Sequence, residues 1–221
     1  MTYHWDFSAV WFNFPELLEG LLGTLKVTAA SLALGLPLGL AVALLRLQRW
    51  RLPAAIAIGF IAVFRTTPPL VQLFWIFYAL PIVADIKLDP FGAAVIALSL
   101  QSAAFFAEVF RGGIVSVERG LWEAGRAIGM RYPALLRRII LPIAIKRMMP
   151  AFLERLIELM KTTSLVSAIA YADLLYSAMV LSARTFRPLE IFTTVALMYF
   201  VVLFGISLAT RAVEARLARS G

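Results

Sequence analysis

The chain has 221 residues, of which 62% are hydrophobic and 15% are charged. This composition excludes an ordinary soluble domain, whose apolar share is about one half, and indicates that the solvent is lipid. A net charge of +8 would suggest a nucleic-acid partner if basic residues lined one folded surface, but here they flank apolar runs. The sequence has no cysteine, which excludes disulfides and thiolate metal sites or nucleophiles.

Five apolar runs are long enough to cross a hydrocarbon core about 30 Å thick, which needs roughly 20 helical residues. The predicted spans are 20–45, 52–84, 91–114, 148–172 and 191–210. Pro68, Pro69 and Pro81 are expected to break the second span. The sequence therefore predicts an all-α integral membrane protein with one membrane domain over residues 1–221, without a soluble module or internal repeat. Residues 1–19 contain no Lys or Arg, so we expect no cleaved signal.

Lys and Arg set the predicted orientation, because loops rich in these residues stay in the cytoplasm. Fourteen of the 21 fall on one side of the predicted spans, three fall on the other, and four lie within spans. This asymmetry places the N-terminus outside and the C-terminus inside. It also accounts for the pI of about 10.3 without nucleic acid.

The predicted cytoplasmic loop 115–147 is too long and too regular to be a simple connector. We expect a short helix that begins at Glu123, where the helix dipole favours a carboxylate, and ends at Gly129. A second helix is expected to run from Tyr132 toward Pro142 along the membrane surface, because its apolar residues leave one side for arginines. A pair of interfacial helices without a partner fits the same pattern.

The residues of this loop resemble the cytoplasmic coupling signature of ABC importer permeases, which is Glu-Ala-Ala, three residues, Gly, nine residues and Ile-x-Leu-Pro. Here Glu123-Ala124-Gly125 precedes Gly129 and then Ile139-Ile140-Leu141-Pro142, with Gly125 where the family usually has alanine. Segments 65–75, 107–114 and 161–165 are similar to the polar amino acid branch of these permeases. The resemblance covers nearly the whole chain and implies a type I ABC importer-like fold.

The resemblance also implies partners. Two permease subunits, either identical or paralogous, would form the pathway, a pair of ATPase subunits would bind ATP and Mg, and an extracytoplasmic binding protein would deliver a polar amino acid. No cofactor is implied for this chain itself, and the implied location is the cytoplasmic (inner) membrane of a prokaryote. The implied contact with the ATPase consists of Glu123, Ala124, Gly125, Ala127 and Gly129.

The fourth predicted span carries Glu154, Arg155, Glu158 and Lys161, and each charge costs about 3 kcal/mol at the centre of a membrane helix. Glu154, Glu158 and Lys161 follow at i, i+4 and i+7, so we expect them on one stripe that faces protein or water. They either line the substrate pathway or pair within the helix, Arg155 with Glu158 and Glu158 with Lys161.

Glu154 departs from the family, which commonly has asparagine at this point. Its carboxylate either binds the cationic group of a basic amino acid or pairs with Arg155 or a partner subunit. Arg65 precedes a Thr-Thr-Pro-Pro sequence, where a broken helix frees backbone groups, and is expected to be a gate or part of an ion pair. Glu108 is expected to pair with Arg111. Ser164, in the segment 161–165, completes the candidate pathway residues.

Three functional classes compete. The leading hypothesis is a transport permease that uses ATP hydrolysed by partner subunits, because the sequence has no Gly-x-x-x-x-Gly-Lys-Ser/Thr phosphate loop. An intramembrane protease lacks a Ser–His pair, since the sole histidine, His4, precedes the first span. A proton-coupled carrier or ion channel that uses the intramembrane carboxylates stays open as the alternative.

Overall fold

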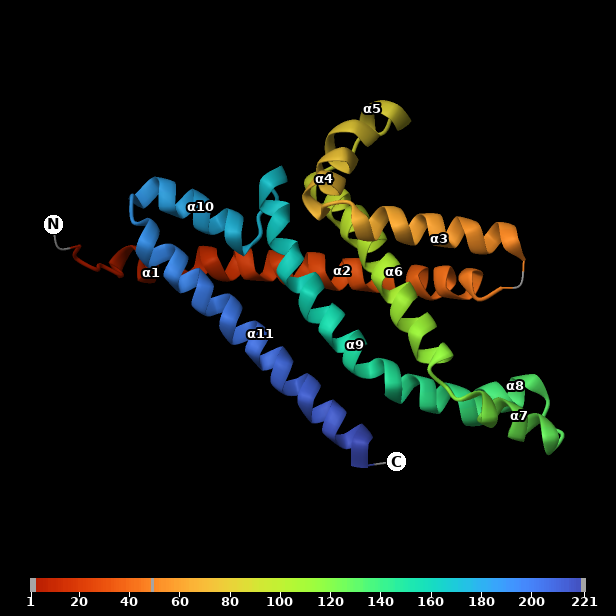
Figure 1. Cartoon of the computed structure of the whole chain (residues 1–221). Coiled ribbons are helices and arrows are strands. Elements are labelled where there is room, and N and C mark those ends of the chain that lie inside the picture. Colours follow the sequence, from red (N-terminus) through yellow and green to blue (C-terminus); the bar gives the residue numbers. More distant parts are fainter. Residues whose placement is uncertain (1–2, 49, 220–221) are drawn as a thin grey trace.

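The computed structural model describes residues 3–48 and 50–219, and these residues form helices without any strand (Figure 1). The longer helices are α2 (Phe14–Arg46), α3 (Arg51–Thr66), α6 (Pro90–Val115), α9 (Leu141–Thr162), α10 (Leu174–Thr185) and α11 (Pro188–Arg219). The shorter segments are α1 (Ser8–Phe12), α4 (Pro69–Phe74), η1 (Trp75–Ala79), α5 (Leu80–Ala84), α7 (Arg119–Ala127), α8 (Tyr132–Leu135), η2 (Leu136–Ile140) and η3 (Thr163–Ile169).

Within the described residues, three helices are individually long and apolar enough to cross a membrane: α2, α6 and the Pro188–Thr210 part of α11. Two further spans exist if each of two bent helix pairs counts as one. The first pair joins α3 to Pro69–Ala84 at 106°, and the second joins Tyr132–Ile169 to α10 at 47°. The predicted all-α membrane fold is confirmed, and the predicted five spans are reached when the bent pairs are included.

The second predicted span is not a straight helix over 52–84. Thr67 and Pro68 are both extended, with ψ of 141° and 134°, because a residue before proline avoids the α conformation. The buried side chain of Gln72 fills the break, and its Nε2 donates to the carbonyl oxygens of Phe64 and Thr67 at 3.1 Å each. The chain thus turns sharply while the carbonyl groups freed by the break keep a hydrogen-bond donor.

Pro81 and Pro142 lie within continuous helix, contrary to the prediction. Each follows a π-helical turn, η1 before Pro81 and η2 before Pro142. The wider turn displaces the carbonyl group that the proline ring would meet in a regular α-helix. As a result, the helix predicted to lie along the membrane surface is continuous with α9, and no boundary separates it from the fourth span.

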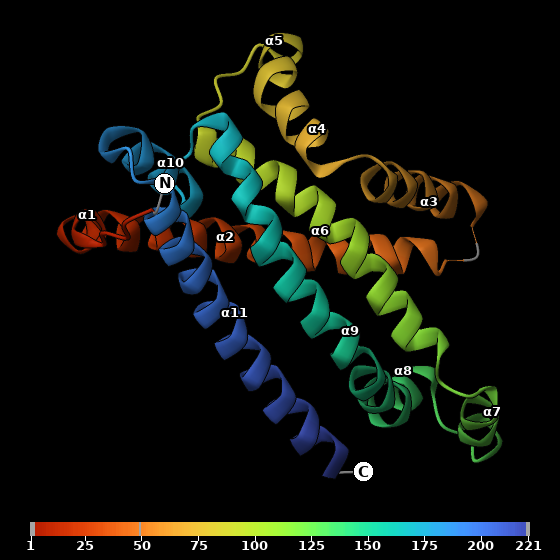
Figure 2. The same cartoon turned by 60° about the vertical axis from the view of Figure 1, so that its left-hand side comes forward.

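Small residues bring α2 against α6, the most extensive helix contact in the structure. A Cβ atom on Gly39 would lie 2.9 Å from the carbonyl oxygen of Ala103, and one on Gly35 would lie 3.1 Å from Cβ of Ser102. The Ser99 hydroxyl donates to the carbonyl oxygen of Ser31 at 3.3 Å. Close backbone approach of this kind holds helices together in lipid, where apolar burial gives little driving force. α9 packs on α6 from another side (Figure 2).

The turn between α2 and α3 lies toward the same end of the molecule as α7 and α8, whereas α1, α5 and α10 lie away from it (Figures 1 and 2). The two basic loops that the charge count assigns to one side therefore share one end. Arg49, which belongs to that count, lies outside the described residues. The sidedness itself stays a prediction.

The N-terminal segment is anchored to the start of α11. The fully buried Glu190 accepts hydrogen bonds from the Tyr3 hydroxyl at 2.6 Å and from the backbone N–H of Asp6 at 3.0 Å. Hydrogen bonds from Ser8 and the nearby charge of Arg187 hold the pKa of the Asp6 carboxyl below its usual value, because both favour the charged form. These contacts connect the described residues before α2 to the start of α11.

Gly23 offers a test of how closely α2 must approach the loop before α10. A Cβ atom there would lie 2.2 Å from the carbonyl oxygen of Ala172, so Gly23→Ala should displace the backbone and lower the free energy of unfolding by about 1–3 kcal/mol. Thermal unfolding of the purified permease complex measures this loss. Gly205→Ala is the matched control, because nothing lies within 4 Å of its Cβ position. Equal melting temperatures for the two variants would contradict the packing described here.

Candidate functional site

Two neighbouring cavities lie among α3, α6 and α9. The first, of about 160 Å³, has polar lining residues Arg65, Thr67, Gln101, Ser102, Arg155, Glu158 and Thr162 and is called here the Thr162 cavity. The second, of about 290 Å³, has polar lining residues Arg65, Glu108, Ser116, Arg147, Glu154 and Arg155 and is called the Arg147 cavity. The Arg147 cavity lies on the side of α7, because it reaches the last turn of α6 and the first turns of α9.

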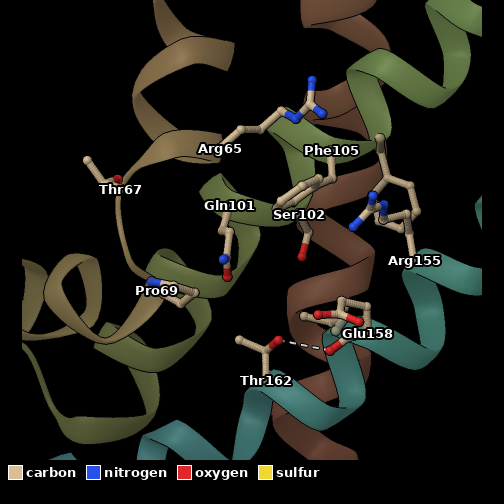
Figure 3. A pocket seen from close by; sticks show the side chains of 11 residues that line it. Arg65, Thr67, Pro69, Gln101, Ser102, Phe105, Arg155, Glu158 and Thr162 are labelled. Atoms are coloured by element: carbon tan, nitrogen blue, oxygen red, sulfur yellow. Dashed lines mark hydrogen bonds between the residues drawn. The ribbon is translucent and has the colours of Figure 1, made fainter.

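Three residues line both cavities: Arg65, Phe105 and Arg155. The guanidinium carbon of Arg155 lies 4.4 Å from the centre of the Phe105 ring, and that of Arg65 lies 5.4 Å from it. Figure 3 shows these side chains, from three different helices, gathered around the ring above Glu158 and Thr162. Cation–π attraction places both cations on the boundary between the cavities.

Glu154, Glu158 and Lys161 are all exposed in the isolated chain, as the predicted stripe on α9 requires, and that this stripe faces protein or water stays a prediction. The ion pairs that were the alternative do not form. Across the described residues, none of these three side chains has an opposite charge within 4 Å, and neither has Arg155. α9 therefore presents uncompensated charges of both signs along one face.

The candidate pathway residues do not all meet. Arg65 lines both cavities, Glu158 lines the Thr162 cavity, and Glu154 lines the Arg147 cavity. Lys161 and Ser164 line neither of these two cavities, and the Ser164 hydroxyl instead donates to the carbonyl oxygen of Lys161 at 2.9 Å. Phe105, which lines both cavities, was not predicted as a site residue.

Glu108 is the centre of a charge cluster. The predicted pair with Arg111 is confirmed at 2.9 Å, and Arg46 at the end of α2 also contacts the carboxylate, while Arg65 lies 3.9 Å away. The Glu108 side chain is only 18% exposed. One acidic group thus joins arginines from three helices. The contact with Arg46 could not be seen in the sequence, because the two residues are 62 positions apart without a linking motif.

The helix predicted in the loop exists but begins earlier than expected. α7 spans Arg119–Ala127, so Glu123 lies at its centre, and the expected stabilisation of Glu123 by the helix N-terminus is wrong. The predicted end is confirmed. Gly129 has φ of +75°, its N–H donates to the Arg126 carbonyl oxygen at 2.9 Å, and the N–H of Met130 donates to that of Gly125 at 3.0 Å. These two bonds form a Schellman motif.

The departure at Gly125 has a packing reason. Gly125 is the buried residue of α7, and a Cβ atom there would lie 2.3 Å from Cδ1 of the fully buried Leu135. The close approach lets α7 rest on α8. Of the five predicted docking residues, Gly125 therefore faces inward, while the other four are exposed, as is Ile128 at 77%.

α7 is firmly attached to the transmembrane helices. An apolar cluster of Val117, Leu135, Ile140, Ala144 and Met148 joins the α7–α8 segment to α6 and α9. Arg147 strengthens the connection, because its guanidinium group donates to the carbonyl oxygen of Ser116 and lies 3.2 Å from the carboxylate of Glu118, the residue before α7. Since Arg147 also lines a cavity, one side chain connects α7 to the interior.

Among the described residues, no cluster of three His, Cys, Asp or Glu side chains is placed to hold a metal ion. The site offers guanidinium, carboxylate, hydroxyl and amide groups around an aromatic ring. Such groups bind and orient a polar, zwitterionic molecule through charge-assisted hydrogen bonds.

The profile of the family described as "Binding-protein-dependent transport system inner membrane component" matches residues 35–219. The chain belongs to this family. The glutamine transport system permease protein GlnP of Escherichia coli (strain K12) is 37% identical to this permease over 213 residues, which cover 96% of this chain and 97% of the relative. The arginine transport system permease protein ArtQ of Bacillus subtilis (strain 168) is 36% identical over 212 residues, with the same two coverages.

Solved structures agree with these relatives. A crystal structure of an amino acid ABC transporter with histidines contains a chain that matches this permease with a TM-score of 0.91, 33% identity and coverage of 97% of this chain and 100% of that one. The MetNI methionine ABC transporter, at 20% identity and a TM-score of 0.75, shares the fold. The predictions of an ABC importer permease and of a transport component rather than an enzyme are confirmed.

Glu108→Gln tests the charge cluster. Removing the carboxylate leaves three arginines without their common partner, so the free energy of unfolding should fall by about 1–2 kcal/mol, less than for a fully buried pair because these side chains are partly exposed. Thermal unfolding of the purified complex is the measurement. Glu19→Gln is the control, since Glu19 is exposed and has no ion pair within 4 Å in the described part of the chain. A Glu108→Gln protein as stable as this control would argue against the cluster.

Proposed function

We propose that this permease is the membrane-spanning subunit of an ATP-driven importer of polar amino acids in the inner membrane of a prokaryote. Its partners are a pair of ATPase subunits, a second permease subunit and an extracytoplasmic binding protein. The observation that carries the proposal is the position of α7, which is anchored to α6 and α9 through buried residues while Glu123, Ala124 and Ala127 stay exposed.

A coupling element must transmit the movement of the ATPase without absorbing it. α7 meets this requirement because it is short, ends in a Schellman motif and rests on Leu135. Its exposed face, with Glu123, Ala124, Ala127, Ile128 and Gly129, is the surface proposed to dock on the ATPase. Arg147 then extends the connection from Glu118, just before α7, to the Arg147 cavity.

The substrate class is supported by the cavities and by the relatives. Each cavity contains both cationic and acidic side chains, as a molecule with an ammonium and a carboxylate group requires. Relatives that cover nearly the whole chain are named for glutamine and arginine transport. Arg65, Glu154 and Glu158 are proposed to line the pathway, together with Lys161 and Ser164 further along the same helical segment.

The exposed stripe of α9 supports the second permease subunit. Charges at Glu154, Glu158 and Lys161 cannot face lipid without a cost of about 3 kcal/mol each. A second permease packed across this face would enclose them in a polar pathway between the two subunits. The pathway would then be complete only in the assembled importer.

Gly129→Val tests the coupling role. Nothing lies within 4 Å of a Cβ atom at Gly129, so the damage would come from φ of +75°, which a β-branched residue adopts only with strain of roughly 1–3 kcal/mol. In membrane vesicles that contain the ATPase and the binding protein, the variant should hydrolyse ATP but lose most of its amino acid uptake. The permease should still assemble in the membrane.

Gly120→Val is the matched control, because it adds the same atoms to α7 at another open position with ordinary helical geometry. Its uptake should stay near that of the wild type. Normal ATP-coupled uptake by the Gly129→Val protein would contradict the proposed role of α7. If wild-type uptake instead collapses with an uncoupler while ATP stays high, the carrier alternative replaces the importer.

Glu154→Gln tests the proposed role of Glu154 in binding a cationic substrate group. Loss of a charge-assisted hydrogen bond corresponds to roughly tenfold weaker interaction or more, so arginine uptake should fall at least tenfold relative to glutamine uptake in the same vesicles. Glu154→Asp, which keeps the charge, should retain a larger share of arginine uptake. An unchanged arginine-to-glutamine ratio in Glu154→Gln would remove Glu154 from substrate recognition.

A further inference from the structure

The boundary between the two cavities has an unusual composition. Within the described part of the chain, three residues line both cavities: Arg65 at the end of α3, Phe105 in the middle of α6 and Arg155 in the middle of α9. The cavities therefore meet at a pair of guanidinium groups held against one aromatic ring (Figure 3). The two cavities are therefore adjacent at these three side chains.

Arg155 lacks the partner that its position calls for. A guanidinium group has five N–H donors, and inside a membrane protein it is normally paired with a carboxylate or with backbone carbonyl groups. Within the described residues, Arg155 has no carboxylate oxygen within 4 Å, and its guanidinium carbon lies 4.4 Å from the centre of the Phe105 ring. The ring attracts the cation but accepts no in-plane hydrogen bond from the guanidinium N–H groups. These donors are therefore available to a ligand.

Two other charged residues that line the Arg147 cavity, Glu108 and Arg147, already have partners. Glu108 is held by Arg46 and Arg111, and Arg147 is held by Ser116 and Glu118. Arg65 approaches Glu108 only to 3.9 Å. Among the described residues, the charged groups of the two cavities that have no ion pair within 4 Å are thus Arg155 at the boundary, Glu158 in one cavity and Glu154 in the other.

We propose that Arg65 and Arg155, supported by Phe105, bind the α-carboxylate of the transported amino acid at the boundary, and that one clamp serves both cavities. The substrate keeps its carboxylate on this pair while its ammonium group faces Glu158 in the Thr162 cavity and the cationic side-chain group of a basic amino acid faces Glu154 in the Arg147 cavity. The inference rests on the proposed importer function and adds its specificity-determining residues. It assigns selectivity for a free carboxylate to this permease, in addition to any selectivity of the binding protein.

The first experiment measures binding without the binding protein. The purified complex of permease and ATPase is incubated with labelled arginine, and unlabelled arginine competes against argininamide, which lacks the carboxylate. The wild type should prefer arginine roughly tenfold or more, because a charge-assisted bidentate contact is lost in the amide. Arg155→Gln should bring this ratio close to one, Arg155→Lys should give an intermediate ratio, and Phe105→Leu should lower it by loosening the guanidinium groups.

Arg51→Gln is the control, because Arg51 is an exposed arginine at the opposite end of α3 from Arg65. Gel filtration and basal ATP hydrolysis show whether each variant is assembled, and Arg155→Lys keeps the test valid if Arg155→Gln fails to assemble. A preference for arginine that survives in Arg155→Lys and Phe105→Leu at the wild-type ratio would overturn the carboxylate clamp.

The second experiment tests whether one clamp serves both cavities, and it uses the absence of cysteine from the chain. Thr162→Cys reports on the first cavity and Ala151→Cys on the second, while Ala183→Cys on α10 is the control. Arginine should slow thiol modification at residues 162 and 151 but not at residue 183, and argininamide should protect neither. Protection at only one of the two cavities, or equal protection by the amide, would overturn the proposal.

Failure of the importer function gives a different result. In that case wild-type vesicles with the ATPase and the binding protein show no ATP-dependent uptake of arginine or glutamine. Failure of the clamp alone leaves that uptake intact and changes only the competition ratios and the protection pattern.

Discussion

The cost of leaving a polar group unpaired in lipid governs most of this structure. Backbone groups freed at the 106° turn are met by Gln72, and each of two prolines inside a helix follows a π-helical turn that avoids a clash. The carboxylate of Glu108 is met by Arg46 and Arg111. The charges of α9 differ from Glu108, because Glu154, Glu158 and Lys161 are exposed in the isolated chain and have no ion pair within 4 Å among the described residues. The proposed contacts with a charged substrate and a second subunit would compensate these charges.

The charged stripe and the cavities depend on how closely the helices meet. Gly35 and Gly39 allow α2 to lie against α6, which fixes the side of α6 that carries Ser102, Phe105 and Glu108 toward α3 and α9. Bulky residues at these glycines would separate the helices and enlarge or erase the two cavities, because packed helices shift as rigid bodies. The site therefore depends on backbone approach on the α2 side of α6, next to the cavity-lining residues Ser102 and Phe106. The charges of the site come from its side chains, whereas the distance between α2 and α6 is set by Gly35 and Gly39.

Much of the fold could be predicted from apolar run length and charge, because lipid imposes length and excludes charge. The stop at Gly129 was also predictable, since a left-handed residue after a helix calls for glycine, as was the pair of Glu108 with Arg111 three positions away. The continuation of helix through Pro142 was not, because proline in a sequence is compatible with both a break and a π-helical turn. The roles of Arg46 and Phe105 could not be predicted for another reason. Their roles arise from contacts between helices distant in sequence, and no local pattern records them.

The connection from α7 to the cavities explains why the departure at Gly125 matters. Glycine there lets α7 settle on Leu135, and Leu135 belongs to the buried cluster that also contains Ala144 and Met148 of α9. A displacement of α7 would thus pass into α9 through packed side chains, and through Arg147 by the direct contact with Glu118. Because Glu154, Arg155 and Glu158 follow on the same helix, such a shift would move the charges of both cavities together. Arg65 and Phe105 lie on α3 and α6, so movement of α9 relative to them would change the spacing of the two guanidinium groups, and with it the grip on a carboxylate.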